Sequence, residues 1–298
     1  MEYILSTDIG GTTFSSALYN KDIKCISRSL KDKIRFYKNR KELILAIENQ
    51  ILDLLKLNQI RKKNILGFGI ACPGPLDTKK GKILDTPNLK ILQNYNIVSS
   101  LTKKLDLDII IENDANMFAL GEWCMNHNEK KAVLGITLGT GLGFGLIYNG
   151  ELYNGGNNMP LEYGLSPFKW GTCEKNISLS YIRKQSFKYY GIEMSPREIE
   201  LKHLNNEIKA INIYDSYGEN LGLALSHVIN IVDPNVIIFG GGLANAFHCF
   251  EKKLKQTLIK HSPSYKVNNI ELLKSDSNNN SSLIGAAYLV RQYFMNRK

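Results

Sequence analysis

The chain has 298 residues, a length that favours two domains over a single core. Hydrophobic residues make up 43% and charged residues 22%, which argues against a disordered or fibrous protein. The net charge is +10, but the lysines are spread along the chain. We therefore expect a solvated surface that also suits an anionic nucleotide and no nucleic-acid partner, with nucleic-acid binding as the alternative.

Targeting and cysteine patterns point to a protein that stays where it is made. No apolar stretch reaches the roughly 20 residues of a membrane helix, and residues 1–8 lack the basic start and apolar middle of a signal peptide. We therefore expect a cytoplasmic protein without a membrane partner.

The five cysteines form no CxxC pair, so buried free thiols are favoured over disulfides or a zinc ribbon.

The first half of the chain predicts a strand, a glycine turn and a second strand, at residues 3–9, 10–11 and 14–19. A third strand at 23–29 follows, and then a helix at 42–57 whose apolar residues recur on one face. The remaining elements expected in this half are a strand at 66–71, a strand at 107–111 and a helix at 115–125.

The second half repeats this order. A strand at 132–138, a glycine turn at 139–143 and a strand at 144–148 are followed by the hairpin turn Asn149-Gly150. The remaining expected elements are a mostly helical stretch at 177–232 that Asp233-Pro234 end, a strand at 236–239, a helix at 243–259, a strand at 270–273 and a helix at 283–294. Two halves that alternate strands and helices predict an α/β fold with an internal duplication.

Three glycine turns, each after a strand, could hold a nucleotide. In Asp8-Ile9-Gly10-Gly11-Thr12-Thr13 the glycines let backbone N–H groups reach an anion, and Asp8 could hold a hydrated Mg²⁺. A tight hairpin with a capping aspartate explains this segment about equally well. A strand follows Gly139-Thr140-Gly141-Leu142-Gly143, which excludes a Rossmann fingerprint, and a Walker A lysine is missing. Gly240-Gly241-Gly242 could pack against a base or ribose.

Asn113-Asp114 follows a buried strand and begins a helix. Phosphoryl transfer needs a base to orient the hydroxyl nucleophile, and an aspartate can serve. Asn and Asp are also favoured helix N-caps, which is the better interpretation on spacing alone.

Five segments, each weak alone, together carry a specific resemblance over essentially the whole chain. They are Asp8-Ile9-Gly10-Gly11-Thr12, Ala71-Cys72-Pro73-Gly74-Pro75, Glu112-Asn113-Asp114-Ala115-Asn116, Leu138-Gly139-Thr140-Gly141-Leu142-Gly143 and Gly240-Gly241-Gly242. In this order they resemble the ROK family of bacterial and archaeal sugar kinases and repressors. The resemblance implies an α/β, actin-like ATPase (ribonuclease H-like) fold with two similar domains and a cleft between them. We expect a sugar and phosphate domain at 1–115, a nucleotide-binding domain at 116–283, and a C-terminal helix at about 284–298 that packs back on the first domain.

The resemblance also implies roles for single residues, ATP and Mg²⁺ as cofactors, and a homodimer. Asp114 matches the catalytic base that takes a proton from a hexose hydroxyl, O6 of a glucose-type sugar. The residues that match sugar contacts are Gly74, Asn88, Asn113, Glu162 and Glu174. Those that match phosphate or nucleotide contacts are Asp8, Gly10, Gly11, Thr12, Thr13, Thr140, Gly141, Gly241 and Gly242. Fructose, mannose, N-acetylmannosamine and N-acetylglucosamine stay open as substrates.

One departure from the family pattern is large. The family has a histidine after Glu-x-Gly and three cysteines that bind zinc with it, whereas this chain has Leu165 and only Cys173 there. Four ligands are needed for a tetrahedral zinc, so we expect no structural zinc. The first glycine turn begins at residue 10, so we expect no N-terminal helix-turn-helix of a repressor. A non-catalytic sugar-binding protein is the other alternative.

Overall fold

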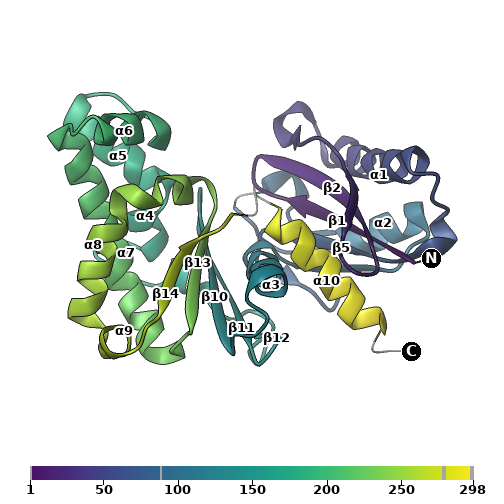
Figure 1. Cartoon of the computed structure of the whole chain (residues 1–298). Coiled ribbons are helices and arrows are strands. Elements are labelled where there is room, and N and C mark those ends of the chain that lie inside the picture. Colours follow the sequence, from purple (N-terminus) through teal and green to yellow (C-terminus); the bar gives the residue numbers. More distant parts are fainter. Residues whose placement is uncertain (1, 88, 277–279, 296–298) are drawn as a thin grey trace. The chain divides into compact units, whose positions relative to one another are not determined.

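The computed structural model describes residues 2–87, 89–276 and 280–295, and its chain divides into two compact units (Figure 1). The first unit comprises residues 1–127, 152–160 and 280–298, and the second comprises 128–151 and 161–279. The α/β prediction is confirmed. This division keeps the helix after Asn113 in the first unit, whereas the sequence analysis put the domain boundary between residues 115 and 116, inside that helix.

The first unit is built on a mixed sheet in the order β3-β2-β1-β5-β9, with β4 also paired to β2. Its strands are β1 (Tyr3–Ile9), β2 (Thr13–Asn20), β3 (Cys25–Arg28), β4 (Asp32–Lys33), β5 (Ile65–Cys72) and β9 (Ile109–Asn113). β1 and β2 are antiparallel, whereas β1, β5 and β9 are parallel. The carboxyl ends of these three strands therefore meet at one edge of the sheet.

Helices cover both faces of this sheet. On one face lie α1 (Arg40–Leu57) and α2 (Ile97–Leu105); on the other lie α3 (Asp114–Asn126) and α10 (Ser281–Met295). The predicted helix at 42–57 begins two residues earlier because Asn39 caps it by accepting from Glu42 N–H. α2 was not predicted, since only Ile97, Leu101 and Leu105 mark its buried face.

The C-terminal helix α10 packs tightly on the first unit, beside α3 and over β5 and β1 (Figure 1). Glycines make this approach possible. A Cβ added to Gly285 would lie 1.9 Å from the Met117 carbonyl oxygen, and one added to Gly121 would lie 2.0 Å from that of Ser281. On β5, a Cβ at Gly69 would lie 2.4 Å from the Ala286 oxygen. The C-terminal helix is thus an integral layer of the unit that begins the chain.

The second unit repeats the strand order of the first, as β12-β11-β10-β13-β14. Its strands are β10 (Ala132–Leu138), β11 (Leu142–Tyr148), β12 (Glu151–Leu152), β13 (Val236–Gly240) and β14 (Glu271–Lys274). β10 is antiparallel to β11 and parallel to β13, which is parallel to β14. The duplication predicted from the pattern of the sequence is therefore present in the topology.

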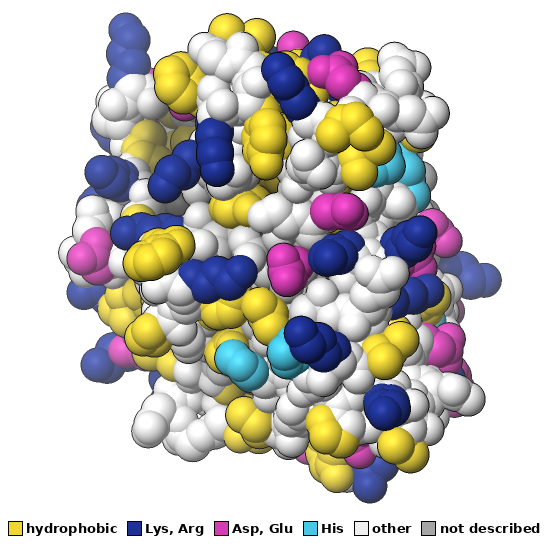
Figure 2. All heavy atoms as spheres, turned by 90° about the vertical axis from the view of Figure 1, so that its left-hand side faces the viewer, with side chains coloured by type: hydrophobic (Ala, Val, Ile, Leu, Met, Phe, Trp, Pro, Cys, Tyr) yellow, Lys and Arg dark blue, Asp and Glu magenta, His cyan; other side chains and the backbone are white. Residues whose placement is uncertain are grey.

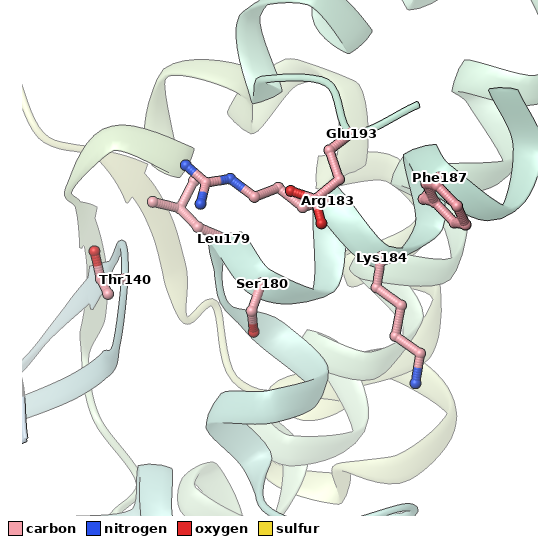
Figure 3. A pocket seen from close by; sticks show the side chains of 7 residues that line it. All are labelled: Thr140, Leu179, Ser180, Arg183, Lys184, Phe187 and Glu193. Atoms are coloured by element: carbon pink, nitrogen blue, oxygen red, sulfur yellow. The ribbon is translucent and has the colours of Figure 1, made fainter. Parts of the chain in front are cut away.

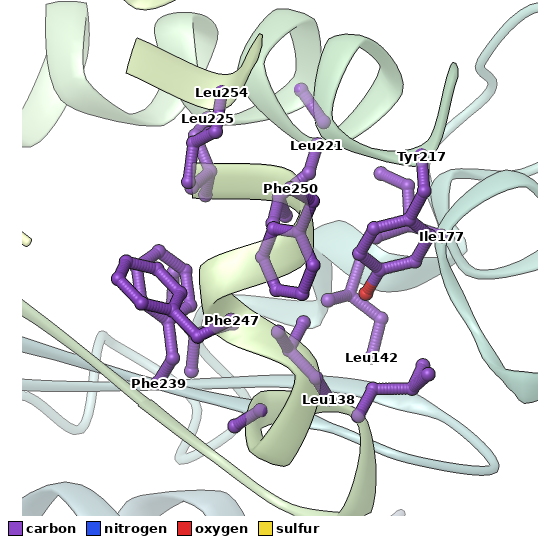
Figure 4. Packing of buried hydrophobic residues seen from close by; sticks show 14 of the residues in the cluster. Leu138, Leu142, Ile177, Tyr217, Leu221, Leu225, Phe239, Phe247, Phe250 and Leu254 are labelled. Atoms are coloured by element: carbon purple, nitrogen blue, oxygen red, sulfur yellow. The ribbon is translucent and has the colours of Figure 1, made fainter. Parts of the chain in front are cut away.

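Helices supply most of the second core. They are α4 (Cys173–Ile177), α5 (Leu179–Tyr190), α6 (Pro196–Leu204), α7 (Ile208–Val232), α8 (Phe247–His261) and α9 (Pro263–Val267). Figure 4 shows Phe239 of β13 beside Phe247 of α8, and Phe250 of α8 between Phe247 and Tyr217 of α7. α7 ends at Asp233, which has φ 48° and precedes Pro234, as predicted.

Three details differ from the sequence prediction. Residues 242–246 form a 3₁₀ turn, η5 (Gly242–Ala246), so the α-helix expected from residue 243 begins at Phe247. The short helix α9 was missed. A small sheet of two-residue strands, β6 (Leu76–Asp77), β7 (Lys82–Ile83) and β8 (Tyr95–Asn96), was also missed, because such strands are too short to show alternation. The remaining 3₁₀ turns are η1 (Ile34–Phe36), η2 (Lys62–Asn64), η3 (Lys90–Leu92) and η4 (Glu162–Leu165).

The described helices include none with both the length and the apolar character needed to span a membrane. On the face that carries helices of the second unit, Lys and Arg side chains are interspersed with acidic, polar and hydrophobic ones (Figure 2).

Candidate active site

Two aspartates come together at the carboxyl edge of the first sheet. Asp8 is the penultimate residue of β1 and lies opposite Ala71 of β5, and Ala71 lies opposite Glu112 of β9. Asp114 begins α3 two residues after Glu112. The parallel strands therefore bring together two acids that are far apart in the sequence.

The electrostatics of Asp8 show how close this approach is. Burial and, to a smaller extent, the neighbouring carboxylate of Asp114 together raise the pKa of Asp8 to about 7, although Lys31 opposes the rise. Cys72, at the end of β5, lies close enough to both aspartates for them to affect its pKa. Burial raises the pKa of its thiol, and Asp114 and Asp8 add to the effect. A cation placed at these carboxylates would relieve their repulsion.

The start of α3 separates the two interpretations of Asn113-Asp114. Asn113 is the N-cap, because its Oδ1 accepts from Ala115 N–H at 2.9 Å and from Asn116 N–H at 3.4 Å. Asp114 is the first helical residue, and its Oδ1 accepts from Ala115 N–H at 2.9 Å. The helix N-terminus favours the ionised carboxylate that a base requires.

The first glycine turn lies next to Asp8 and joins β1 to β2. Gly10 N–H donates to the Thr13 carbonyl at 2.8 Å, which closes the hairpin. Gly11 and Thr12 at its tip are exposed, and Thr13 is half-buried. Backbone N–H groups and hydroxyls are therefore presented at a surface where a phosphate could reach them.

Two predicted sugar contacts fall on the segments that follow β5 in the sequence. Gly74 is half-buried and directly precedes Pro75, whose carbonyl accepts from Leu84 N–H at 3.0 Å. Asn88 lies outside the described residues.

The second glycine turn joins β10 to β11. Gly139 N–H donates to the Gly141 carbonyl at 3.0 Å, and the Gly139 carbonyl accepts from Leu179 N–H at 2.9 Å. The latter bond ties the turn to the start of α5. Thr140 at the tip is exposed, and a Cβ on Gly139 would meet no atom within 4 Å. This turn, like the first, presents its outer side to a ligand.

Glu162 and Glu174 lie near each other in the second unit. Glu174 Oε2 accepts from Leu142 N–H at 3.2 Å, directly after the second turn. Burial raises the pKa of Glu162 and the like charge of Glu174 raises it further, although the Glu162 side chain is exposed. Glu162 begins η4, in which Gly164 packs so closely that its Cβ would lie 2.3 Å from the Leu142 oxygen. Glu174 therefore has a structural partner, whereas Glu162 points its carboxylate toward the surface.

Hydrogen bonds close the loop that carries the zinc motif in the family pattern. Phe168 N–H donates to the Gly171 carbonyl at 2.8 Å, and Cys173 N–H donates to that of Ser166 at 3.0 Å. Cys173 is buried, and Leu165, at the histidine position, is 61% exposed. Across residues 2–87, 89–276 and 280–295, no three or more His, Cys, Asp or Glu side chains are grouped to hold a metal ion.

The glycines after β13 have different surroundings. Gly241 has φ 84°, and a Cβ there would lie 2.4 Å from the Leu138 carbonyl oxygen, so close packing alone requires glycine. A Cβ on Gly242 would meet nothing within 4 Å, so this residue leaves an open surface. The α-helix begins only at Phe247, so the expected helix N-terminus directly after the glycines is absent.

A cavity of about 400 Å³ lies between the second turn and α5. Its lining residues are Thr140, Leu179, Ser180, Arg183, Lys184, Phe187 and Glu193. In Figure 3 the Arg183 guanidinium extends toward the side where Thr140 lies, and Lys184 extends away from it. Our sequence prediction missed Arg183 and Phe187, and Gly241 and Gly242 are not among the lining residues. An aromatic ring and a guanidinium beside an exposed phosphate-type turn suit a nucleotide.

Comparison with known proteins decides the family. The model of the ROK family matches residues 4–293. The chain belongs to the ROK family.

Relatives of this ROK protein include kinases for different sugars. A glucokinase from Thermotoga maritima is 26% identical over 314 residues, an alignment that covers 97% of each chain. An N-acetyl-D-glucosamine kinase from Mannheimia succiniciproducens is 30% identical, over 85% of this chain and 88% of the relative. The crystal structure of a ROK glucokinase from Streptomyces griseus with glucose and AMPPNP superposes with a TM-score of 0.80 at 21% identity, over 97% of this chain and 99% of that one. ROK sugar kinases have the actin-like ATPase fold, and the predicted fold class is confirmed.

The donor set at Asp8 fits a hydrated Mg²⁺. Mg²⁺ prefers hard oxygen ligands and keeps several waters, so it needs only one or two carboxylates together with phosphate oxygens. Asp8 offers such a carboxylate, half-buried beside Asp114. Burial raises its pKa most, and the negative charge of Asp114, which a cation would balance, adds to the rise.

Proposed function

We propose that this ROK protein is an ATP-dependent sugar kinase that phosphorylates a hexose hydroxyl, O6 of a glucose-type sugar, with Asp114 as the base. The observation that carries the proposal is the approach of Asp114 to Asp8 beside the Gly10–Thr13 turn. Under this proposal the base, the Mg²⁺ ligand and the phosphate donors of the first turn would belong to one unit. Relatives named glucokinase and N-acetyl-D-glucosamine kinase support the reaction class.

In this reaction Asp114 accepts the proton of the attacking hydroxyl. The hydroxyl oxygen forms a bond to the γ-phosphorus of ATP as the bond to the β–γ bridging oxygen breaks, which releases ADP. Asn113 uses its Oδ1 for the helix cap. Its Nδ2 group can therefore donate to a sugar hydroxyl while the cap fixes the side chain. Placing a base in this way contributes roughly 10²–10⁴-fold to the rate.

The glycine turns and Asp8 serve the phosphates. We assign phosphate contacts to Gly10, Gly11, Thr12 and Thr13 in the first unit and to Thr140 and Gly141 in the second. When bound, Mg²⁺ would neutralise charge on the β- and γ-phosphates, and Asp8 would hold it through water. The cavity at Arg183 and Phe187 would take the adenosine half, with Gly241 and Gly242 at its periphery.

We assign sugar contacts to Gly74, Asn88, Asn113 and Glu162. Glu174 would act on the sugar indirectly, because its carboxylate is bonded to Leu142 N–H. Fructose, mannose, N-acetylmannosamine and N-acetylglucosamine are alternative acceptors.

A substrate panel tests the proposal. Purified protein with ATP and Mg²⁺ is incubated with each of these hexoses, and ADP release is followed by a coupled assay. We expect sugar-dependent turnover for at least one hexose. Asp114→Asn should fold and bind sugar normally but lose at least 10²-fold in kcat. The base assignment fails if the Asp114→Asn enzyme turns over at near-normal rate, and the kinase proposal fails if no sugar stimulates ADP release.

Family membership also allows a regulator, since a ROK transcriptional regulator superposes with a TM-score of 0.84. Filter binding to duplex DNA at physiological salt, together with the ATPase panel, separates the two activities. We further propose a homodimer, which light scattering coupled to size-exclusion chromatography would test.

A further inference from the structure

The edge of the first sheet carries a β-bulge beside the glycine turn. β3 pairs Arg28 with Ala17 of β2, and β4 pairs Asp32 with Phe14. From one pair to the other, β2 spans three residue steps (17 to 14), whereas the segment from β3 to β4 spans four (28 to 32). One residue is therefore extra. Because Ser29 N–H donates to the Ser16 carbonyl at 2.9 Å, Leu30 and Lys31 remain for the interval that faces Ser15. Bulges near functional sites often redirect a side chain.

The register puts Lys31 on the same face of the sheet as Asp8. Side chains of paired residues point to the same face, and the face alternates along each strand. Asp8 pairs with Ser15 of β2, the neighbour of Phe14, and Lys31 directly precedes Asp32, which pairs with Phe14. Phe14 and Ile34 point to the opposite face, where they are buried in the core with α1. Lys31, Ser15 and Asp8 thus form a row across the strands at the edge where the glycine turn lies.

The backbone fixes this segment to the turn itself. Ile34 N–H donates to the Thr12 carbonyl at 2.9 Å, and Lys33 pairs with Thr13. The Lys31 side chain is exposed, and its charge acts on the Asp8 carboxylate, where it lowers the pKa. Lys33 is directed differently, since its Nζ lies 6.0 Å from the centre of the Phe36 ring. Lys31 is therefore the cation of this segment that faces the phosphate edge.

We propose that the Lys31 ammonium binds the terminal phosphate oxygens of the phosphoryl donor and so selects a triphosphate over a monophosphate. The inference rests on the proposed kinase function. Neither Gly10-Gly11-Thr12-Thr13 nor Gly139-Thr140-Gly141 contains a lysine, so the turns themselves offer only neutral donors. A lysine on a neighbouring strand can supply the missing point charge, as lysines do in many phosphate sites.

The test compares Lys31→Ala and Lys31→Arg with a matched control, Lys24→Ala. Lys24 is also exposed but lies in the turn between β2 and β3, at the other end of β2. Isothermal titration in the presence of Mg²⁺ gives the affinities of each variant for AMPPNP and for AMP, and steady-state kinetics give kcat and KM for ATP. Circular dichroism checks that each variant is folded.

We expect Lys31→Ala to weaken AMPPNP binding roughly 10- to 100-fold, since one charge-assisted contact is lost, and to leave AMP binding unchanged. Lys31→Arg should retain most of the AMPPNP affinity, and Lys24→Ala should match the wild type. Equal affinities of Lys31→Ala and wild type for AMPPNP would overturn the proposal, as would an equal loss for AMPPNP and AMP. If the wild type shows no turnover with any sugar, the kinase proposal fails. The ratio of the affinities for AMPPNP and AMP, compared between Lys31→Ala and wild type, still tests the role of Lys31.

Discussion

Replacing Gly285 with alanine tests how the C-terminal helix positions the proposed base. The new Cβ would lie 1.9 Å from the Met117 carbonyl oxygen, whereas real contacts essentially never fall below 3.0 Å, so α10 and α3 must separate by about 1.1 Å. A gap of this size forfeits a quarter to a half of the dispersion energy of contacts between the two helices, such as the edge-on ring pair of Trp123 and Tyr288, whose centroids lie 5.9 Å apart. We put the loss of packing and the strain at about 3 kcal/mol. Alanine gains about 1 kcal/mol in helix propensity, which leaves a net destabilisation of about 2 kcal/mol.

Thermal unfolding followed by circular dichroism measures this effect, with Gly156→Ala as control because a Cβ there meets nothing within 4 Å. For a unit of this size we expect the transition of the first unit to fall by about 4–8 °C. The rate of phosphoryl transfer should fall as well, because Ser282 Oγ donates to the Asp114 carbonyl at 3.5 Å and the start of α3 would shift. If Gly285→Ala were as stable as Gly156→Ala, the glycine contact would not limit the approach of the two helices, and the reasoning would be wrong.

Three other predictions concern the second unit. Gly241→Ala should lower the free energy of unfolding by roughly 1–3 kcal/mol and raise KM for ATP, because φ is 84° at this residue and the β10 backbone lies too close for a Cβ. Gly242→Ala should leave the stability unchanged, because a Cβ there meets nothing within 4 Å. Urea titration and steady-state kinetics compare the two variants. Arg183→Ala should raise KM for ATP about tenfold and leave KM for the sugar unchanged, and an equal change in both would refute its assignment to the nucleotide. Burial and the charge of Glu174 raise the pKa of Glu162, so ionisation of this carboxyl opposes folding. Glu162→Gln should therefore raise Tm at pH 8 and leave it unchanged near pH 4. A rise in Tm found only at acid pH would contradict the direction of the pKa shift.

The sequence was sufficient for features that depend on local pattern. Both glycine hairpins, the long helix α1 and the end of α7 at Asp233 follow from spacing and turn chemistry, and the structure confirms them. Asn113 as the cap was also predictable, because capping is a local preference. The comparisons confirm the family that the five segments indicated, whereas the roles of the individual site residues stay predictions.

Features that depend on tertiary contacts were not predictable. Arg183 and Phe187 line the cavity only because Leu179 N–H bonds to the Gly139 carbonyl, which fixes α5 beside a turn 40 residues earlier. The proposed position of Lys31 beside Asp8 depends on one extra residue between β3 and β4, and the hydrophobic pattern of the sequence does not reveal such a residue. α3 belongs to the first unit because it packs closely against α10 at Gly285. The sequence does not reveal this contact, because a glycine within a helical pattern only weakens the prediction of a helix.

The two sheets explain why the proposed chemistry resides in the first unit, although both units present a glycine turn. The topologies are the same, so positions can be matched through their pairing: Asp8 lies opposite Ala71 in the first sheet, and Thr137 lies opposite Gly240 in the second. The duplicated fold thus offers two glycine turns for the proposed phosphate contacts, but of the matched strands β1 and β10, β1 has an aspartate as its penultimate residue and β10 a threonine. A threonine at the equivalent position has no charge to balance a cation and cannot take up a proton at neutral pH. Under the proposed function, this difference at one strand end would leave the second unit with nucleotide binding, while the first unit would hold the groups that react.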